Sequence, residues 1–575
     1  MLKLIKFLKP YRLIICAIVL LVFIQSLSQL FLPGLMADIV DNGIVSGDIN
    51  YIFNVGLVMI LVTLGGTICA IGASFLASKT AIGFGKQVRS SLFTHIQSFS
   101  LNEYDKFGAA SLITRTTNDI VQVQMVVLMM LRMMFTAPLM MIGGIIMAVS
   151  RDPQLSMVVF IVMPLLVLTI TVIAKKGLPL FKAVQTKLDK LNRVMRENLT
   201  GIRVIRAFNR IDHEQNRFDV ANKDLTNTAI KVNKLMAVAM PLMTLLLNLT
   251  AVATIWYGSF RVDAGSMQVG DLMAFLQYIM FIMFSLMMVS MMFVMIPRAM
   301  VSADRVSKVL EVEPKIKDPE TKNNPKKKKG HIEFKNVSFY YPGAEKPALS
   351  NISFSAKPGE VTAIIGSTGS GKSTLVNLMP RFYDVTCGDI LINDVSIKDF
   401  SQKHLREKIG YVPQKALLFS GTISDNIRYG KDNASDEEVR HAAETAQALE
   451  FISDMKDGFE SEINQGGVNL SGGQKQRLSI ARALIRKPEI YIFDDSFSAL
   501  DFKTDAQLRK ALKSETKDST LLIVGQRVSS IMDADRIIVL DQGKIAGMGT
   551  HKELMESSEV YQQIVFSQLS KEEIA

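Results

Sequence analysis

The chain has 575 residues, more than one soluble domain usually contains, since most domains have about 100–200 residues. Hydrophobic residues make up 49% of it and charged residues only 21%, which excludes intrinsic disorder and collagen-like structure and indicates that part of the chain lies in a membrane. The net charge of +11 fits either a nucleic-acid-binding surface or the basic cytoplasmic loops of a membrane protein, so its distribution along the chain decides between them.

Six apolar segments long enough to cross a bilayer lie in the first half of the chain. A transmembrane helix needs about 20 mostly apolar residues. The first segment follows a basic start, but it is longer than the apolar core of a signal peptide and no small-residue cleavage motif follows it, so we expect it to be retained. The six predicted spans are residues 13–32, 52–77, 126–149, 155–174, 236–257 and 272–296.

Lysine and arginine are distributed unevenly between the connections of these spans. The connection 45–50 contains neither, and Arg151 and Arg261 are the only ones in the other two short connections, whereas residues 175–234 are rich in both. Because positively charged loops stay in the cytoplasm, the long connections and both termini are predicted to be cytoplasmic, in a protein of the cell membrane. The positive charge then reflects orientation, and no nucleic-acid partner is expected.

The two long connections have apolar residues at helical spacing and few helix breakers. Connections of this length are seldom structureless inside a folded protein. The membrane helices are therefore expected to continue into the cytoplasm and to return through turns near residues 102–108 and 209–217.

Methionine and one arginine stand out within the predicted spans. Methionines are concentrated at residues 125–134 and 280–295, a composition that suits either a surface for varied apolar ligands or ordinary packing. Arg132 lies inside the third span, where a charge is costly and often functional. It either serves the function or reaches the cytoplasmic edge of the bilayer.

The composition changes after Met300. Residues 313–330 contain three prolines and a run of four lysines at 326–329, with almost nothing apolar, and are predicted to be a linker. The linker separates a membrane domain, residues 1–312, from a soluble domain, residues 331–575.

A glycine-rich loop follows a short apolar segment at residues 361–365. The segment is predicted to be a buried strand, and an apolar helical pattern follows the loop, which is the context that a GxxxxGK[ST] phosphate-binding loop requires. Backbone N–H groups of such a loop surround the phosphates, the lysine reaches the β- and γ-phosphates, and the Ser373 hydroxyl ligates Mg²⁺. The predicted nucleotide-binding residues are Gly366, Ser367, Thr368, Gly369, Ser370, Gly371, Lys372, Ser373 and Thr374.

Two further motifs follow. The apolar segment 489–493 ends at Asp494, whose carboxylate is placed to enter the coordination shell of Mg²⁺. Before it, a Ser-Gly-Gly turn opens a helical stretch, which is another phosphate-binding shape. Since one phosphate-binding loop accounts for this chain's own ATP, the turn predicts contact with a second nucleotide. It comprises Leu470, Ser471, Gly472, Gly473 and Gln474.

With these motifs in this order, residues 331–575 resemble the nucleotide-binding domain of an ABC transporter, and the six spans resemble the membrane domain of ABC exporters. The resemblance implies a multi-pass α-helical membrane domain fused to a cytoplasmic α/β P-loop domain, with ATP and Mg²⁺ as cofactors. It also implies a dimer in which each ATP lies between one subunit's Walker motifs and the other's signature motif. By motif position, Tyr341 stacks on adenine, and Gln414 contacts the γ-phosphate and Mg²⁺.

Two positions depart from the family pattern. Asp495 stands where the family usually has a glutamate that orients the attacking water, and its carboxylate is drawn back by about 1 Å, a misplacement that can cost roughly 10²-fold in rate. Gln526 stands where the switch histidine is expected and has no ionisable imidazole. The chain is therefore similar to the degenerate-site subunit of bacterial heterodimeric multidrug exporters. The resemblance implies a partner half-transporter that carries the catalytic glutamate and the switch histidine.

The expected function is ATP-driven export of small amphipathic or hydrophobic compounds across the cell membrane of a bacterium. Lipids and hydrophobic peptides are alternative substrates. An ATP-gated channel or a regulatory subunit is the alternative of another class. A pump accumulates its substrate against a gradient, whereas a gate only dissipates one. The fusion of membrane and ATPase domains in one chain favours export, because importers usually have them on separate chains.

Overall fold

The computed structural model describes residues 2–319 and 330–568, so the lysine run at 326–329 in the predicted linker lies outside the described residues. The chain divides into two compact units. The membrane unit consists of Met1–Gln97 and Ala109–Val312, and the nucleotide unit consists of Ser98–Gly108 and Glu313–Ala575.

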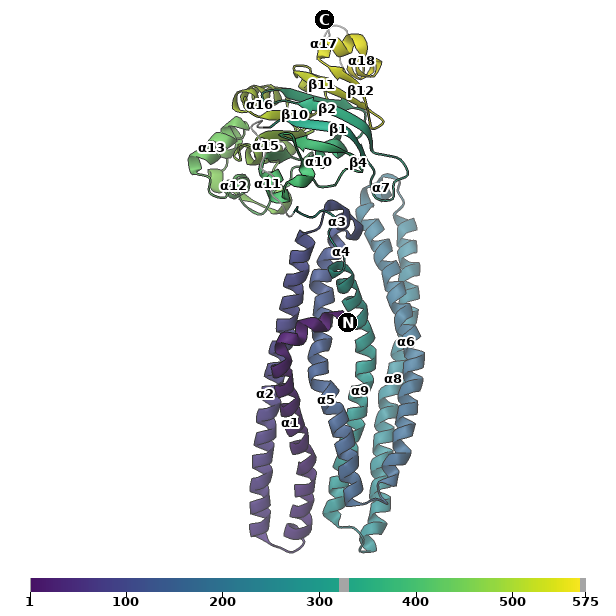
Figure 1. Cartoon of the computed structure of the whole chain (residues 1–575). Coiled ribbons are helices and arrows are strands. Elements are labelled where there is room, and N and C mark those ends of the chain that lie inside the picture. Colours follow the sequence, from purple (N-terminus) through teal and green to yellow (C-terminus); the bar gives the residue numbers. More distant parts are fainter. Residues whose placement is uncertain (1, 320–329, 569–575) are drawn as a thin grey trace. The chain divides into compact units, whose positions relative to one another are not determined.

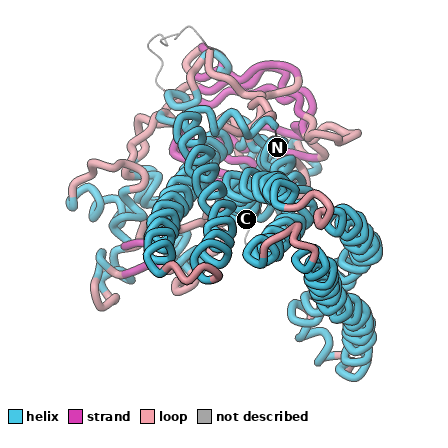
Figure 2. Tube along the Cα trace, turned by 90° about the horizontal axis from the view of Figure 1, so that it is seen from below, coloured by secondary structure: helices cyan, strands magenta, loops and turns pink. Residues whose placement is uncertain are grey.

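Long helices that run nearly side by side make up the membrane unit (Figures 1 and 2). In the described part of the chain, six helical stretches are long and apolar enough to cross a membrane, which confirms the six predicted spans. The helices are η1 (Leu2–Tyr11), α1 (Arg12–Asp38), η2 (Ile39–Ile44), α2 (Ile49–Gln97), α4 (Ala109–Thr114), η3 (Arg115–Asp119), α5 (Ile120–Arg151), α6 (Met157–Thr200), α7 (Ile202–Ala207), α8 (Ile211–Asp263) and α9 (Val269–Leu310).

Three of these helices are much longer than a bilayer is thick. Helices α2, α6 and α8 have 49, 44 and 53 residues. At 1.5 Å per residue they extend for about 65–80 Å, whereas the hydrocarbon core of a bilayer is about 30 Å thick. The long connections are thus continuations of the membrane helices, as the sequence predicts.

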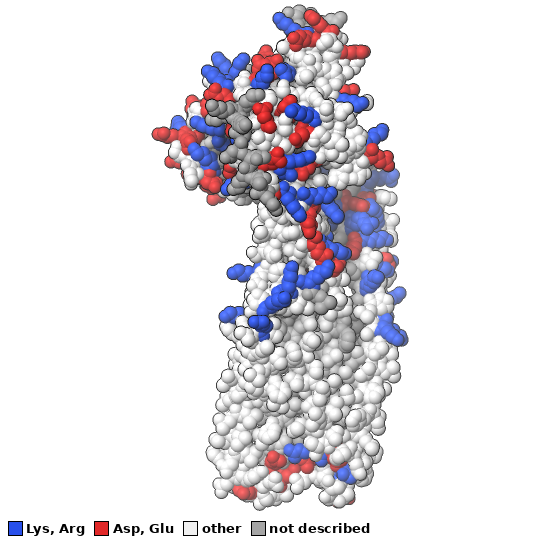
Figure 3. All heavy atoms as spheres, viewed as in Figure 1, with Lys and Arg blue, Asp and Glu red and all other residues white. Residues whose placement is uncertain are grey.

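The three short connections, residues 45–48, 152–156 and 264–268, lie at one end of the membrane unit, here called the short-loop end (Figure 1). Ion pairs join the helices there: Arg151 of α5 contacts Asp271 of α9 at 2.7 Å, and Arg261 of α8 contacts Asp152 at 2.9 Å. Buried apolar side chains from α5, α6 and α9 pack just inside this end. Figure 3 shows a broad, mostly uncharged band of surface next to these charged groups, beyond which charged side chains reappear toward the other end of the membrane unit.

Two main sheets form the nucleotide unit. The six-stranded sheet has the order β12-β11-β3-β10-β9-β6, in which β11, β3, β10, β9 and β6 are parallel. The four-stranded sheet is antiparallel, with the order β2-β1-β4-β5. The strands are β1 (Ile332–Phe339), β2 (Leu349–Ala356), β3 (Val361–Gly366), β4 (Cys387–Ile392), β5 (Val395–Ser396), β6 (Ile409–Val412), β7 (Gly421–Thr422), β8 (Glu462–Ile463), β9 (Ile490–Asp494), β10 (Thr520–Val524), β11 (Arg536–Asp541) and β12 (Lys544–Gly549).

Helices cover the parallel strands, which explains why β9 and β10 are mostly apolar and are buried along their whole length. The α-helices of this unit are α3 (Leu101–Phe107), α10 (Lys372–Leu378), α11 (Gln402–Glu407), α12 (Ile423–Arg428), α13 (Asp436–Thr445), α14 (Leu449–Ser453), α15 (Gly472–Leu484), α16 (Phe502–Glu515), α17 (His551–Ser557) and α18 (Glu559–Phe566). The fold class predicted from the sequence, six membrane helices fused to an α/β P-loop domain, is confirmed.

Helix α3 belongs to the nucleotide unit although it lies between α2 and α4 in the chain. A capping box begins it, since the Ser100 N–H donates to the Glu103 carboxylate at 2.8 Å. Leu101 packs against the core beneath the four-stranded sheet, and the Tyr383 hydroxyl donates to the Asp105 carboxylate at 3.0 Å. These contacts fix the turn that the sequence predicts near residues 102–108.

Candidate nucleotide site

The glycine-rich loop joins the end of β3 to the start of α10, as predicted. Gly371, at the N-cap of α10, has φ = 99°, and a Cβ there would lie 2.8 Å from the Ala348 carbonyl oxygen. A Cβ on Gly366 would overlap the Leu540 carbonyl oxygen. Glycine is therefore required at both positions for the loop to close in this shape.

Lys372 and Ser373 lead out of this loop. The Lys372 ammonium donates to the carbonyl oxygens of Gly366 and Ser367 at 2.8 and 2.9 Å, so the lysine is folded back over the loop. Burial lowers the pKa of Lys372, and the charges of Asp495 and Asp494 oppose that effect. The lysine is thus held where an anionic phosphate would exchange these carbonyl contacts for stronger charge-assisted ones.

Asp494, at the end of β9, accepts a hydrogen bond from the Ser373 hydroxyl at 3.1 Å. Burial raises the pKa of Asp494, and the neighbouring Asp495 carboxylate adds to that effect. A hydroxyl and a carboxylate side by side are hard oxygen donors of the kind that Mg²⁺ prefers. These two residues fit the predicted Mg²⁺ site, because a divalent cation would also neutralise the paired carboxylates.

Asp495 lies at the centre of the three positions predicted to act on the γ-phosphate and the attacking water. Its Oδ2 accepts hydrogen bonds from the side-chain amides of Gln526 at 2.9 Å and Gln414 at 3.1 Å. Gln414 follows β6, Asp495 follows β9 and Gln526 follows β10, and these are adjacent parallel strands whose carboxyl ends meet at one edge of the sheet. Burial raises the pKa of Asp495, and the hydrogen bonds from Gln414 and Ser498 oppose it.

The predicted adenine contact, Tyr341, lies beside the helix that follows the loop. Its hydroxyl is 3.0 Å from the Thr374 hydroxyl, and its ring packs edge-on to Phe339 and Tyr383. More than a third of Tyr341 is exposed, so a ring face is accessible to a base. The structure therefore brings Tyr341 to the glycine-rich loop.

The motif Leu470–Gln474 forms the start of α15. Ser471 is the N-cap, and its N–H donates to the Gln474 side chain at 2.9 Å in a capping box. Both Ser471 and Gly472 are exposed, and a Cβ on Gly472 would meet no atom within 4 Å. The backbone at the start of this helix is therefore accessible to an anion from another molecule.

Known proteins are similar to this chain in both sequence and fold. A family model described as the ABC transporter transmembrane region matches residues 15–287, and one described as ABC transporter matches residues 349–498. An uncharacterized ABC transporter ATP-binding protein of Mycobacterium tuberculosis is 43% identical over 564 residues, which are 97% of each chain. The chain belongs to the ABC transporter family.

A second related sequence and a solved structure are also similar to this ABC transporter subunit. The uncharacterized ABC transporter ATP-binding protein YfiB of Bacillus subtilis is 42% identical over 570 residues, 99% of each chain. A solved bacterial Atm1-family ABC exporter with ATP bound has the same fold, with a TM-score of 0.80 at 24% identity over 98% of this chain and 99% of that one. The chain is thus a multi-pass membrane protein and an ATP-hydrolysing transporter subunit.

The motifs of this ABC transporter subunit do not include two residues that hold the site in place. Gln568, just after α18, accepts from the Val528 N–H and donates to the Gln526 carbonyl oxygen, both at 2.8 Å. It therefore fixes the backbone on both sides of Arg527, beside Gln526. A glutamine near the end of the chain carries no sequence signal for this role, which arises only from tertiary contact.

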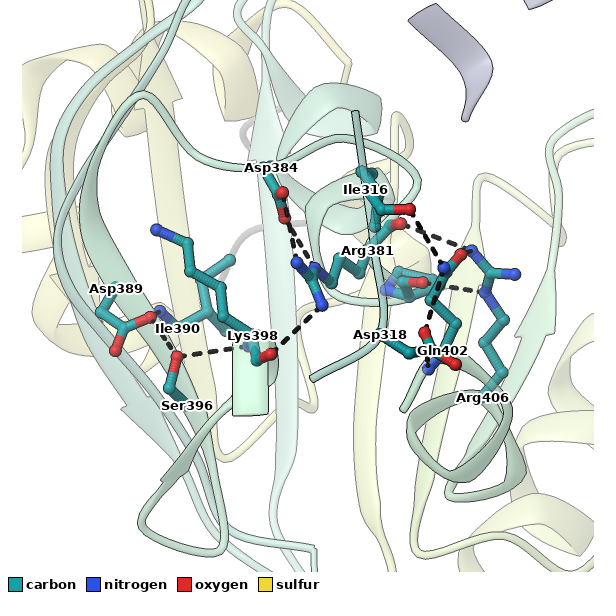
Figure 4. Close-up of polar contacts among 11 residues, drawn as sticks. Ile316, Asp318, Arg381, Asp384, Asp389, Ile390, Ser396, Lys398, Gln402 and Arg406 are labelled. Atoms are coloured by element: carbon teal, nitrogen blue, oxygen red, sulfur yellow. Dashed lines mark hydrogen bonds and ion pairs between the residues drawn. The ribbon is translucent and has the colours of Figure 1, made fainter. Parts of the chain in front are cut away.

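The second such residue is Tyr383, which packs edge-on to Tyr341 and bonds Asp105 of α3. The segment around it is fixed by polar contacts (Figure 4): Arg381 donates to Asp384 at 2.7 Å, and Arg406 donates to the Pro380 carbonyl oxygen at 3.1 Å. In the ABC transporter subunit, Tyr383 thus connects α3 with the side chain predicted to contact adenine.

Proposed function

We propose that this chain is one half of a heterodimeric ABC exporter of the cell membrane, with both termini in the cytoplasm. Its substrates are small amphipathic or hydrophobic compounds of the multidrug type. In this proposal residues 1–312 form the transmembrane domain, residues 313–330 a linker and residues 331–575 the nucleotide-binding domain. ATP binding closes the two nucleotide domains on each other, and hydrolysis allows them to separate again. This cycle switches the membrane helices between an inward-facing and an outward-facing state.

The observation that carries the heterodimer proposal is the pair of amides on Asp495. A catalytic base must reach the attacking water with a free carboxylate oxygen. Here one oxygen of the shorter aspartate, Oδ2, already accepts from Gln414 and from Gln526, which leaves only Oδ1 to contact the water. A glutamine side chain does not take up a proton near neutral pH, so Gln526 cannot share that task. This chain's own Walker motifs are therefore expected to bind Mg-ATP and to hydrolyse it slowly.

The exposed start of α15 supports the other half of the proposal. Leu470–Gln474 is intact, and its Ser471 and Gly472 are exposed. The motif is expected to contact the γ-phosphate of ATP bound by a partner that carries the catalytic glutamate and the switch histidine. Mg²⁺ held by Ser373 and Asp494, with Gln414 near it, would neutralise charge on the transferred phosphoryl group. The residues of this chain bind and orient the nucleotide.

The test compares two substitutions in the heterodimer purified with its partner. Asp495→Asn should leave most of the steady-state ATPase activity at saturating Mg-ATP, because the site that it changes is already slow. Ser471→Arg puts a bulky charged group where the partner's γ-phosphate must bind, and losing a positioned phosphate donor costs on the order of 10²–10³ in rate.

Ser435→Arg is the matched control, because Ser435 is also an exposed N-cap with a capping box, on α13. It should cost only the cap, about 0.5–2 kcal/mol of stability, and no activity. If Asp495→Asn reduces the ATPase activity as much as Ser471→Arg does, Asp495 is a working base and the two sites are equivalent.

Uptake into inverted vesicles separates export from the alternative of an ATP-gated channel. An exporter accumulates an apolar dye above its outside concentration in proportion to the ATP hydrolysed. A gate or regulatory subunit would only speed the equilibration of the dye across the membrane. Export of lipids or peptides would appear as uptake of those compounds in place of the dye.

A further inference from the structure

A cavity of about 360 Å³ lies between α1, α2, α5 and α9 of the membrane unit. Most of its lining is apolar, including three methionines. Three polar side chains also face it, one from α1 and two from α5. The residues that matter below are Gln25, Met129, Arg132, Met133, Thr136 and Met288.

The cavity lies far from the short-loop end. At 1.5 Å per residue, Arg132 is about 28 Å along α5 from Arg151, and Met288 is about 28 Å along α9 from Val269. The hydrocarbon core of a bilayer is about 30 Å thick, so both residues lie close to its opposite boundary. In the proposed topology this is the cytoplasmic leaflet, the level at which a compound in the cell or in that leaflet first meets the transporter.

Arg132 brings an uncompensated positive charge into this cavity. Among the described residues, no carboxylate lies within ion-pair distance of it, whereas at the short-loop end Arg151 and Arg261 both pair with aspartates. Charged residues within membrane spans are rare, face the bundle interior or a cavity, and pair there with a counter-charge or mark a substrate pathway. Because the side chain is exposed in a cavity between four helices, a bound ligand can supply the missing negative charge.

We propose that this cavity is a substrate site for amphipathic organic anions, compounds with an apolar body and one carboxylate, sulfonate or phosphate group. The guanidinium of Arg132 binds the anionic group through two parallel hydrogen bonds, and the Gln25 amide adds a donor. The flexible thioethers of Met129, Met133 and Met288 adapt to apolar bodies of different shape. This inference rests on the proposed function and narrows its substrate class.

The Thr136 hydroxyl adds no donor to the cavity. It donates to the Arg132 carbonyl oxygen at 2.8 Å, within the helix, and so has no proton left for the ligand. The cavity therefore offers an anion one cation and one amide. A cationic compound would meet Arg132 with no acidic side chain among the lining residues to offset the repulsion.

Equilibrium binding of a matched pair of probes tests the proposal. The heterodimer is placed in nanodiscs of phosphatidylcholine without ATP, and a dansyl-labelled alkyl carboxylate is compared with the dansyl-labelled alkyl trimethylammonium of the same chain length. The wild-type protein should bind the carboxylate at least about tenfold more tightly, the effect expected of one charge-assisted contact. Arg132→Ala should remove that preference, Arg132→Lys should keep part of it, and Arg132→Glu should reverse it.

Arg298→Ala is the matched control, since Arg298 lies about 44 Å along α9 from Val269 and does not line the cavity. It should leave both affinities unchanged. Thermal unfolding and nucleotide photolabelling like those of the wild type show that each variant is folded. Equal affinity of the wild type for the two probes, or undiminished carboxylate binding by Arg132→Ala, would overturn the inference.

Two further arms separate the sources of the anion and the two proposals. If the natural ligand is a lipid, anionic phosphatidylglycerol in the nanodisc should compete with the carboxylate probe in the wild type but not in Arg132→Ala. If it is a free organic anion, phosphatidylglycerol should not compete. Binding is measured in the absence of ATP and is therefore independent of transport. If the protein binds the carboxylate probe but shows no ATP-driven uptake, only the exporter proposal is contradicted. If it shows uptake but no preference for the carboxylate probe, only the cavity proposal is contradicted.

Discussion

At the scale of single residues, the chemistry of the site depends on what surrounds Asp495. Its φ of 49° places it in the left-handed region just after β9, and its N–H donates to the Val524 carbonyl oxygen at 3.0 Å. The backbone there is fixed, so the reach of the side chain alone decides where the carboxylate lies. A methylene more or less at this position is therefore expected to change the rate far more than the binding of ATP.

Restoring the family residues should repair this site. In a heterodimer whose partner carries glutamine in place of its catalytic glutamate, Asp495→Glu with Gln526→His should raise the remaining ATPase activity by roughly 10²-fold. The longer carboxylate then reaches the water, and the imidazole replaces an amide that does not take up a proton near neutral pH. Phosphate release under single-turnover conditions measures the change. The gain requires an intact signature in the partner, and a restored pair with no gain would indicate that the partner's signature is also degenerate.

At the scale of elements, one partly buried carboxylate joins the two sheets of the nucleotide unit. Glu489, just before β9, accepts from the Lys408 ammonium before β6 and from the Asn393 amide after β4, both at 2.8 Å. Burial raises the pKa of Glu489, but these donors outweigh it and hold the pKa below its ordinary value of 4.5. Because the folded-state pKa is depressed, this carboxylate stabilises the fold above its unfolded pKa, and that stabilisation is lost as the pH falls through the folded value.

Glu489→Gln should lower the stability of the nucleotide unit at neutral pH by about 1.5–3 kcal/mol, because the largely buried Lys408 loses its counter-charge. The difference from the wild type should shrink as the pH falls through the lowered folded-state pKa of Glu489, where the wild-type carboxylate is protonated as well. Thermal unfolding of the full chain at a series of pH values measures it. Glu313→Gln is the control, since Glu313 pairs with Lys317 in an exposed position where such a pair contributes about 0–1 kcal/mol. Equal effects of the two variants would contradict the structural role of Glu489.

At the scale of the whole molecule, charge and apolarity are separated along the helices of the membrane unit. Figure 3 shows an uncharged band next to the short-loop end, and α2, α6 and α8, with 49, 44 and 53 residues, are longer than a bilayer requires and therefore continue beyond it. The basic connection between α6 and α8 lies on the side of these extensions. The proposed topology places the extensions in the cytoplasm and the short-loop end outside.

Labelling of single cysteines on intact cells tests this topology. In a background without Cys16, Cys69 and Cys387, the exposed residues Ser46 and Ser266 at the short-loop end should react with an impermeant thiol reagent after substitution by cysteine. Ser453→Cys, exposed in the nucleotide unit, should react only after the cells are opened. Labelling of Ser453→Cys on intact cells would show that the orientation is the opposite of the proposed one.

The sequence by itself determined the features that depend on local chemistry. Six apolar segments had to become helices, because a backbone in lipid must satisfy its own hydrogen bonds. Gly366 and Lys372 identified the phosphate-binding loop. Glycine allows the backbone to close around an anion, and the lysine binds the phosphate charge. The departures at Asp495 and Gln526 were also readable from motif position alone.

Tertiary structure decided which of these residues meet. Gln414, Asp495 and Gln526 are far apart in the sequence, and only the order β10-β9-β6 in the sheet brings their side chains together. The roles of Gln568 and Tyr383, and the placement of α3 in the nucleotide unit, likewise have no local signal, since they rest on contacts between distant segments. Arg132 was visible in the sequence as a charge inside a span, but only the packing of α1, α2, α5 and α9 places it in a cavity, because the free energy of a charge in a membrane depends on which neighbours the fold supplies.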